Sequence, residues 1–165
     1  MAPRAHILVD ADACPVKDET YRVAARHGVP VTVVANSGFR VPMDRLPDGT
    51  RLVTPVIVSD RFDAADDWIA EQAAALVGEG VRTIVVTADI PLADRALRAG
   101  AVALKPTGRE WDAANIGGAL ATRAIMADLR AGADGASRNI GGPPPFSKND
   151  RSNYLQALDR ALTRK

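Results

Sequence analysis

The sequence predicts a single α/β domain with a mostly parallel, five-stranded sheet and helices on both of its faces. Short apolar runs alternate with helical patterns along the chain, an order typical of βαβ units. Of its 165 residues, 47% are hydrophobic and 25% are charged, as expected for one globular domain of ordinary size. We therefore expect residues 1–165 to form one three-layer domain, with residues 133–165 as a basic C-terminal extension packed on it.

The first half of the chain contains three short apolar strands, expected at residues 6–10, 31–35 and 52–58. Two helices are expected with them, at residues 16–27 and 64–77. Pro15 suits the first turn of the first helix, and Gly28 suits its end. Pro55 has no amide hydrogen to donate, which indicates that the third strand lies at an edge or is bent.

The second half continues the alternation with strands expected at residues 83–87 and 101–104, and helices at residues 90–98 and 111–130. We expect Gly117 and Gly118 to interrupt the second of these helices, because glycine is a poor helix former. A Gly/Ser/Pro-rich connection leads to a final helix at residues 151–163. Its apolar side consists of Tyr154, Leu155, Leu158 and Leu162.

Several function classes are excluded by the composition. The longest apolar runs are far shorter than the roughly 20 residues of a membrane span, and no basic segment followed by an apolar stretch is visible at the start, so we expect neither a membrane span nor a secretory signal. The single cysteine, Cys14, cannot form an internal disulfide, which favours a reducing, cytoplasmic setting. We interpret Cys14 as a small packed residue, since no histidine or asparagine partner is apparent. Assembly of identical subunits stays open.

Aspartates follow three of the expected strands. They account for 16 of the 20 acidic residues, and those next to strand ends are Asp10, Asp12, Asp63, Asp66, Asp67, Asp89 and Asp94. The carboxyl ends of parallel strands meet at one edge of a sheet, so these side chains are expected to gather there. Mutual repulsion would raise their pKa values unless a cation were bound. Mg²⁺ or Mn²⁺ is the ion that such oxygen ligands favour, and the two histidines have no metal-ligand spacing.

Each aspartate also has a simpler interpretation. Residues 63–67 could cap a helix, Asp89 could be the N-cap before Ile90 and Pro91, and Asp94 could be solvated. Asp10 is the hardest to explain in this way, because a carboxylate that ends a buried strand needs partners. The combined pattern favours a metal site.

Four motifs in order resemble the YaiI/YqxD family, also called UPF0178 or DUF188: residues 9–17 (VDADACPVK), 63–67 (DAADD), 87–93 (TADIPLA) and 141–151 (GGPPPFSKNDR). The resemblance runs from about Ile7 to Leu162. The family is similar to PIN-like domains, whose better-known members are metal-dependent ribonucleases. This resemblance implies a PIN-like domain whose metal-facing residues are Asp10, Asp66 or Asp67, Asp89 and Asp94. The usual PIN pattern has one acid after the first strand, and its middle glutamate has no match here, so Asp66 and Asp67 would replace it.

The C-terminal end of the chain is basic. Residues 138–165 carry six basic and two acidic side chains, whereas residues 1–137 carry 15 basic and 18 acidic ones. An acidic cleft repels a polyanion, so nearby cations must hold the phosphates. We expect this role for Arg40, Arg138, Lys148 and Arg151. Phe39 and Phe146 could stack on bases, although Phe146 could equally pin the last helix to the body.

The function favoured by the sequence is a Mg²⁺- or Mn²⁺-dependent nuclease that acts on RNA more readily than DNA. Its catalytic carboxylates would be Asp10, Asp66, Asp67 and Asp89, and Asp12 and Asp94 would be further metal ligands. A haloacid-dehalogenase-like phosphatase is the alternative enzyme, with Asp10 as nucleophile. Against it, Cys14 occupies the expected threonine position, and Lys105 follows the late acids instead of preceding them. A nucleic-acid-binding or protein-binding module without turnover is the third hypothesis.

Overall fold

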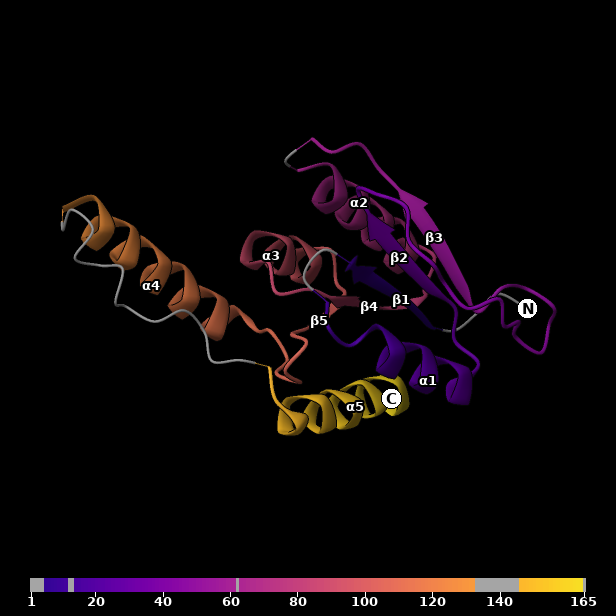
Figure 1. Ribbon diagram of the computed structural model, residues 1–165. Coiled ribbons are helices and arrows are strands. Elements are labelled where there is room, and N and C mark those ends of the chain that lie inside the picture. The colour runs from indigo at the N-terminus through magenta and orange to yellow at the C-terminus, as the bar shows by residue number, and fades with distance from the viewer. Residues whose placement is uncertain (1–4, 12–13, 62, 133–145, 165) are drawn as a thin grey trace.

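The computed structural model describes residues 5–11, 14–61, 63–132 and 146–164 (Figure 1). Five parallel strands form one sheet in the order β3-β2-β1-β4-β5. The strands are β1 Ala5–Asp10, β2 Val31–Ala35, β3 Val53–Ile57, β4 Arg82–Val86 and β5 Val102–Leu104. The helices are α1 Lys17–His27, α2 Ala64–Gly78, α3 Ile90–Arg98, α4 Ala113–Gly132 and α5 Lys148–Thr163. The predicted α/β class and the five-stranded sheet are confirmed.

The sheet is the middle of three layers. Side chains alternate between the two faces of a strand, so Ile7 and Val9 of β1 join the core beneath α1 and α5, whereas Leu8 joins the core beneath α2 and α3. All three side chains are fully buried. Figure 1 shows α1 and α5 side by side, and α4 extending away from the sheet. The strand β1 therefore lies in the middle of the strand order and contributes side chains to the cores on both faces of the sheet. Its carboxyl end lies midway along the edge that the strand ends form.

Of three local expectations, the structure confirms one and corrects two. Pro55 does lie in an edge strand, since β3 ends the strand order. Gly117 and Gly118 do not interrupt α4, which is one continuous helix. The last helix begins at Lys148, three residues earlier than expected, because Ser147 caps it. The Ser147 hydroxyl accepts the Asp150 amide at 3.1 Å, and the Asp150 carboxylate accepts the Ser147 amide at 3.0 Å.

The helix α5 is a full part of the core. Tyr154 is completely buried, and its hydroxyl lies 2.6 Å from the Thr20 hydroxyl of α1. Nearer the end of α5, Asp159 lies 2.7 Å from the His27 ring nitrogen. These contacts join the two ends of the chain on one face of the sheet.

A tight turn after β5 also contacts α5. The Lys105 amide donates to the Arg109 carbonyl at 2.8 Å, and the Gly108 amide donates to the Lys105 carbonyl at 2.9 Å. Gly108 has a φ of 93°, and a Cβ added there would lie 2.5 Å from the Asn153 carbonyl carbon. Only glycine therefore allows the backbone of this turn to lie against the backbone of α5.

No helix within the described ranges is both long and apolar enough to cross a bilayer.

Candidate functional site

The site begins with Asp10, the last residue of β1. Its relative exposure is 7%, and the hydroxyl of Thr87 donates a hydrogen bond to Asp10 Oδ2 at 3.0 Å. Thr87 directly follows β4, which pairs with β1 so that Val86 lies opposite Val9. The parallel register therefore places these two strand ends side by side. The sequence indicated that a buried carboxylate at this position needs a partner, and the structure identifies Thr87 as one.

The same hydroxyl connects Asp10 to Asp89. The Asp89 amide donates to Thr87 Oγ1 at 2.9 Å, while Asp89 Oδ1 accepts the Leu92 amide at 2.9 Å. Asp89 is thus the N-cap of α3, as its simpler interpretation proposed, and the same geometry holds it next to Asp10. Trp111 donates its indole N–H to the Thr87 carbonyl at 3.1 Å. Thr87 is therefore held on both sides and acts as a bridge between the two aspartates.

Asp66 joins this pair from the first turn of α2. Burial, together with the negative charges of Asp89 and Asp10, raises the pKa of Asp66 to about 6, against the opposing charge of Arg95. The helix packs over β1 and β4, which brings its first turn to the same edge of the sheet. Three carboxylates from three βα junctions thus share one electrostatic environment.

The other acidic residues at this edge have arginine partners. Asp67 lies 2.7 Å from Arg95 and 3.3 Å from Arg61. Asp94 pairs with Arg98 at 3.1 Å along α3. Asp63 also pairs with Arg61, at 3.1 Å, and Asp12 lies outside the described residues. Exposed pairs of this kind contribute only about 0–1 kcal/mol to stability. Their effect is to hold Asp63, Asp67 and Asp94 against arginine side chains of the protein itself.

The donor set at this edge is open. Within residues 5–11, 14–61, 63–132 and 146–164, no three histidine, cysteine, aspartate or glutamate side chains lie close enough together to hold a metal ion. Mg²⁺ commonly binds through one or two carboxylates and keeps several waters. Asp10 and Asp89, which are connected through Thr87, could serve as the one or two carboxylates of such a site, whereas a closed structural site would need more ligands.

The expected phosphate contacts fall into two groups. Arg151 of α5 donates to the Pro15 carbonyl at 3.0 Å and to Glu19 at 2.8 Å, and its guanidinium lies 4.9 Å from the centre of the Phe146 ring. Arg151 and Phe146 therefore connect α5 to α1, which favours the pinning interpretation. Arg40 and Lys148 are exposed. Arg138 lies outside the described residues.

Sequence reasoning missed one cation near the acidic edge. Lys17 begins α1, and its ammonium lies 5.5 Å from the centre of the Phe39 ring. Burial raises the pKa of Cys14 to about 11, while the charge of Lys17 lowers it and the charge of Asp10 raises it. Lys17 and Asp10 therefore lie within electrostatic range of the same thiol. The presence of Lys17 in the motif at residues 9–17 was the feature of the sequence that could have identified it as a site residue. Cys14 itself is a protonated, buried residue.

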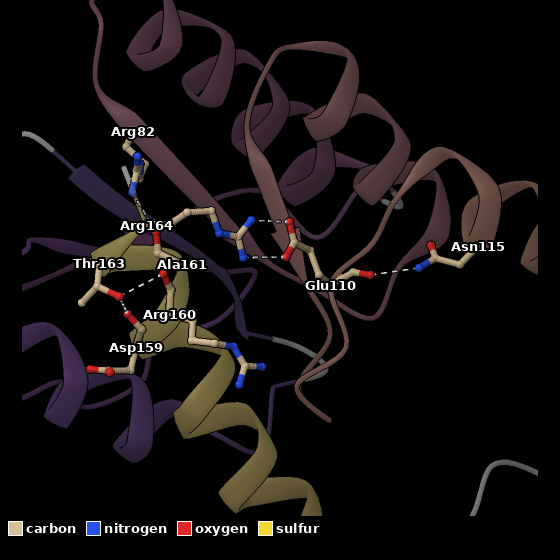
Figure 2. A network of polar contacts seen from close by, with 8 residues as sticks. All are labelled: Arg82, Glu110, Asn115, Asp159, Arg160, Ala161, Thr163 and Arg164. Atoms are coloured by element: carbon tan, nitrogen blue, oxygen red, sulfur yellow. Dashed lines mark hydrogen bonds and ion pairs between the residues drawn. The ribbon is translucent and has the colours of Figure 1, made fainter.

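A cavity of about 650 Å³ lies at the opposite edge of the sheet, between the starts of β1 and β4. Its arginines are already bonded: Arg82 donates to the Ala161 carbonyl at 3.2 Å, and Arg164 pairs with Glu110 at 3.1 Å (Figure 2). Ligands of open parallel sheets bind beyond the carboxyl ends of the strands. We therefore place the functional site at the Asp10 edge.

Comparison with known proteins identifies the family. A family model described as an uncharacterised YaiI/YqxD family, DUF188, matches residues 8–164. The chain belongs to the YaiI/YqxD family. It is 61% identical to a UPF0178 protein of Sphingopyxis alaskensis over 158 residues, covering 96% of this chain and 93% of that protein. A UPF0178 protein of Rhodopseudomonas palustris is 51% identical, covering 96% of this chain and 92% of that protein. No solved structure is significantly similar to this chain.

The raised pKa of Asp66 makes a prediction about the stability of this YaiI/YqxD protein. Its folded-state pKa of about 6 exceeds the ordinary value of 3.8. The folded state therefore binds this proton more tightly than the unfolded state does. The contribution of Asp66 to the free energy of unfolding is present below about pH 4 and is lost as the pH rises through about 6. Asp66→Asn should remove that loss.

We expect Asp66→Asn to raise the free energy of unfolding near pH 7.5 by about 1 kcal/mol, allowing for solvent screening of a partly exposed group. That corresponds to a rise in Tm of roughly 2–4 °C. The check is thermal unfolding of both proteins in EDTA across this pH range. A difference in Tm that stays the same at every pH would contradict the assigned origin of the shift.

Proposed function

We propose that this protein is a divalent-metal-dependent nuclease that hydrolyses phosphodiester bonds, with RNA preferred to DNA. The observation that carries the proposal is the hydrogen-bonded unit of Asp10, Thr87 and Asp89 at the carboxyl edge of the sheet. The Thr87 hydroxyl holds the Asp10 carboxylate and the Asp89 backbone, and the Asp89 carboxylate caps α3 at the same edge, within electrostatic range of Asp66 on α2. The preference for RNA rests on the resemblance of the family to PIN-like ribonucleases.

The residues of the site divide the work in this proposal. Asp10 and Asp89 would hold Mg²⁺ or Mn²⁺, and Asp66 supplies a further carboxylate from α2. The chemistry that a bound ion would supply there is polarisation of a phosphoryl oxygen and activation of water. Thr87 is a positioning residue, since its one hydroxyl orients the Asp10 carboxylate and fixes the backbone of Asp89. Asp67 and Asp94 would act as outer ligands only after release from their arginines.

Substrate phosphates would approach the acidic edge from the side on which basic side chains flank it. Lys17 and the exposed Arg40 lie at the ends of β1 and β2, on the side of Asp10 away from β4. The ring of Phe39 holds the Lys17 ammonium by a cation–π contact, which is worth about 0.5–1 kcal/mol at an exposed position. Cations fixed in this way attract a polyanion to a site that would otherwise repel it.

The test is cleavage of labelled, mixed-sequence, single-stranded RNA by the purified protein. We expect cleavage with Mn²⁺ or Mg²⁺, none in EDTA, and slower cleavage of matched single-stranded DNA. The same preparation is tested on p-nitrophenyl phosphate and on trapping at Asp10 by a metal fluoride. Trapping with phosphatase turnover would replace the proposal by the dehalogenase-like phosphatase. Binding of RNA without cleavage in either metal would leave a binding module and contradict the nuclease.

A further inference from the structure

We propose that the turn after β5 and the outer face of α5 form a second anion site, a pocket that binds a phosphate group. The pocket has a volume of about 320 Å³ and is lined by Thr107, Gly108, Arg109, Asn153, Gln156 and Arg160. A volume near 300 Å³ is at the lower end of small-molecule pockets. It suits a phosphate group together with part of the sugar that carries it.

The lining residues have the chemistry of a phosphate site. They offer two guanidinium groups, two carboxamides and one hydroxyl, and none of them is a carboxylate. A guanidinium presents a planar pair of N–H donors that matches two phosphate oxygens. A neutral sugar would not need two cations, and a metal ion would be repelled by them.

The two arginines of the pocket are available for a ligand. Neither Arg109 nor Arg160 has a carboxylate partner among the residues that the structure describes, whereas Arg164 on the same helix end pairs with Glu110 at 3.1 Å. Figure 2 shows the Arg160 guanidinium pointing away from the Asp159 carboxylate, which instead accepts from His27 at 2.7 Å. The acidic residues next to the two arginines in sequence, Glu110 and Asp159, are thus engaged with other partners.

The floor of the pocket is rigid. Gly108 lies against the Asn153 backbone in a conformation that only glycine adopts without strain, and the Lys105 and Arg109 backbones bond to each other at 2.8 Å. The Lys105 ammonium lies 4.3 Å from the centre of the Trp111 ring. This lysine adds positive charge beside the pocket. Its pKa is lowered mainly by burial and to a smaller extent by the positive charge of Arg109.

The pocket is connected to the acidic edge by a short chain of contacts. Trp111, which carries the Lys105 ammonium on its ring, donates to the carbonyl of Thr87, and Thr87 donates to Asp10. We expect a nucleic-acid strand cleaved at Asp10 to place one of its phosphates in this pocket where the strand passes the β5 side, in addition to the Lys17 side already described. This nucleic-acid source of the phosphate rests on the proposed function, but the affinity of the pocket for phosphate does not.

Two variants of the full chain test the inference in EDTA, where no cleavage interferes. Arg109→Ala/Arg160→Ala removes both guanidiniums, and Arg22→Ala/Arg45→Ala removes the same charge from exposed positions elsewhere. Binding of labelled single-stranded RNA is measured by fluorescence anisotropy over a series of KCl concentrations. We expect the pocket variant to bind about tenfold more weakly at low salt. Its log–log salt slope should be shallower by about 0.7 for each phosphate that the variant no longer neutralises.

A second arm uses inorganic phosphate followed by NMR of the backbone amides, with chloride as the control anion. We expect shifts of the Thr107 and Gly108 amides in the wild type and none in the pocket variant. Phosphate-induced shifts with an unchanged RNA salt slope would assign the pocket to a small phosphorylated ligand. The absence of both effects relative to the control variant would overturn the inference. Phosphate-induced shifts in a wild-type protein that cleaves no RNA would support the anion site and contradict only the proposed nuclease.

Discussion

Asp10→Asn should reduce metal-dependent cleavage of single-stranded RNA by at least about 100-fold. Loss of a residue that only supports a metal ligand costs up to about 100-fold, and loss of a ligand itself should cost at least as much. Asparagine has the same shape and still accepts the Thr87 hydroxyl through its amide oxygen. The substitution therefore removes the charge that would hold the cation and keeps the hydrogen bond to Thr87. The measurement is the initial rate in Mn²⁺, with circular dichroism to verify folding.

Two companion variants make the result specific. Thr87→Val keeps the shape of the side chain but loses the hydroxyl that bridges Asp10 and Asp89. We expect it to be about 10–100-fold slower, with an increased Mn²⁺ requirement, since it acts through the aspartates. Asp48→Asn, in an exposed loop, is the charge-matched control and should cleave at the wild-type rate. A wild-type rate for Asp10→Asn would remove this edge from the mechanism.

Gly108→Ala should destabilise the folded protein by about 2–5 kcal/mol. The alanine Cβ would lie 2.5 Å from the Asn153 carbonyl carbon and 2.6 Å from its oxygen, and both belong to helical backbone that cannot rotate away. Overpacking of this kind costs about 1–3 kcal/mol, and a left-handed conformation costs a further 1–2 kcal/mol or so. The check is urea unfolding followed by circular dichroism.

Gly118→Ala is the matched control for that substitution. Gly118 lies inside α4, and nothing is within 4 Å of a Cβ added there. Alanine is the better helix former, so this variant should gain roughly 0.5–1 kcal/mol. Equal stability of the two variants would show that the turn after β5 moves away from α5 without cost.

The sequence was most informative where hydrophobic periodicity and chain order act together. The strand Val31–Ala35 and the helix Ile90–Arg98 have the predicted bounds, because continuous burial defines the first and the Asp89 cap with Gly100 defines the second. Asp10 was singled out because a carboxylate that ends a buried strand needs partners. The structure gives it Thr87 as one such partner.

The parts that could not be predicted depend on contacts between distant segments. Nothing local distinguishes Asp66 from Asp67, yet the first shares an environment with Asp10 and the second pairs with Arg95. Arg151 likewise looked like a free cation until Glu19, on a helix near the other end of the chain, became its partner. Continuity of α4 through Gly118 was missed because glycine lowers helix stability by only about 1 kcal/mol, and the rest of the helix compensates for it.

The most direct test of the central claim is a crystal structure of the protein soaked in Mn²⁺, with the ion located by its anomalous scattering. We expect an ion with carboxylate oxygens of Asp10 and Asp89 within about 2.0–2.6 Å, and Asp66 in its first or second coordination sphere. An ion bound elsewhere, or no ion at this edge at saturating Mn²⁺, would contradict a metal site at Asp10 and Asp89.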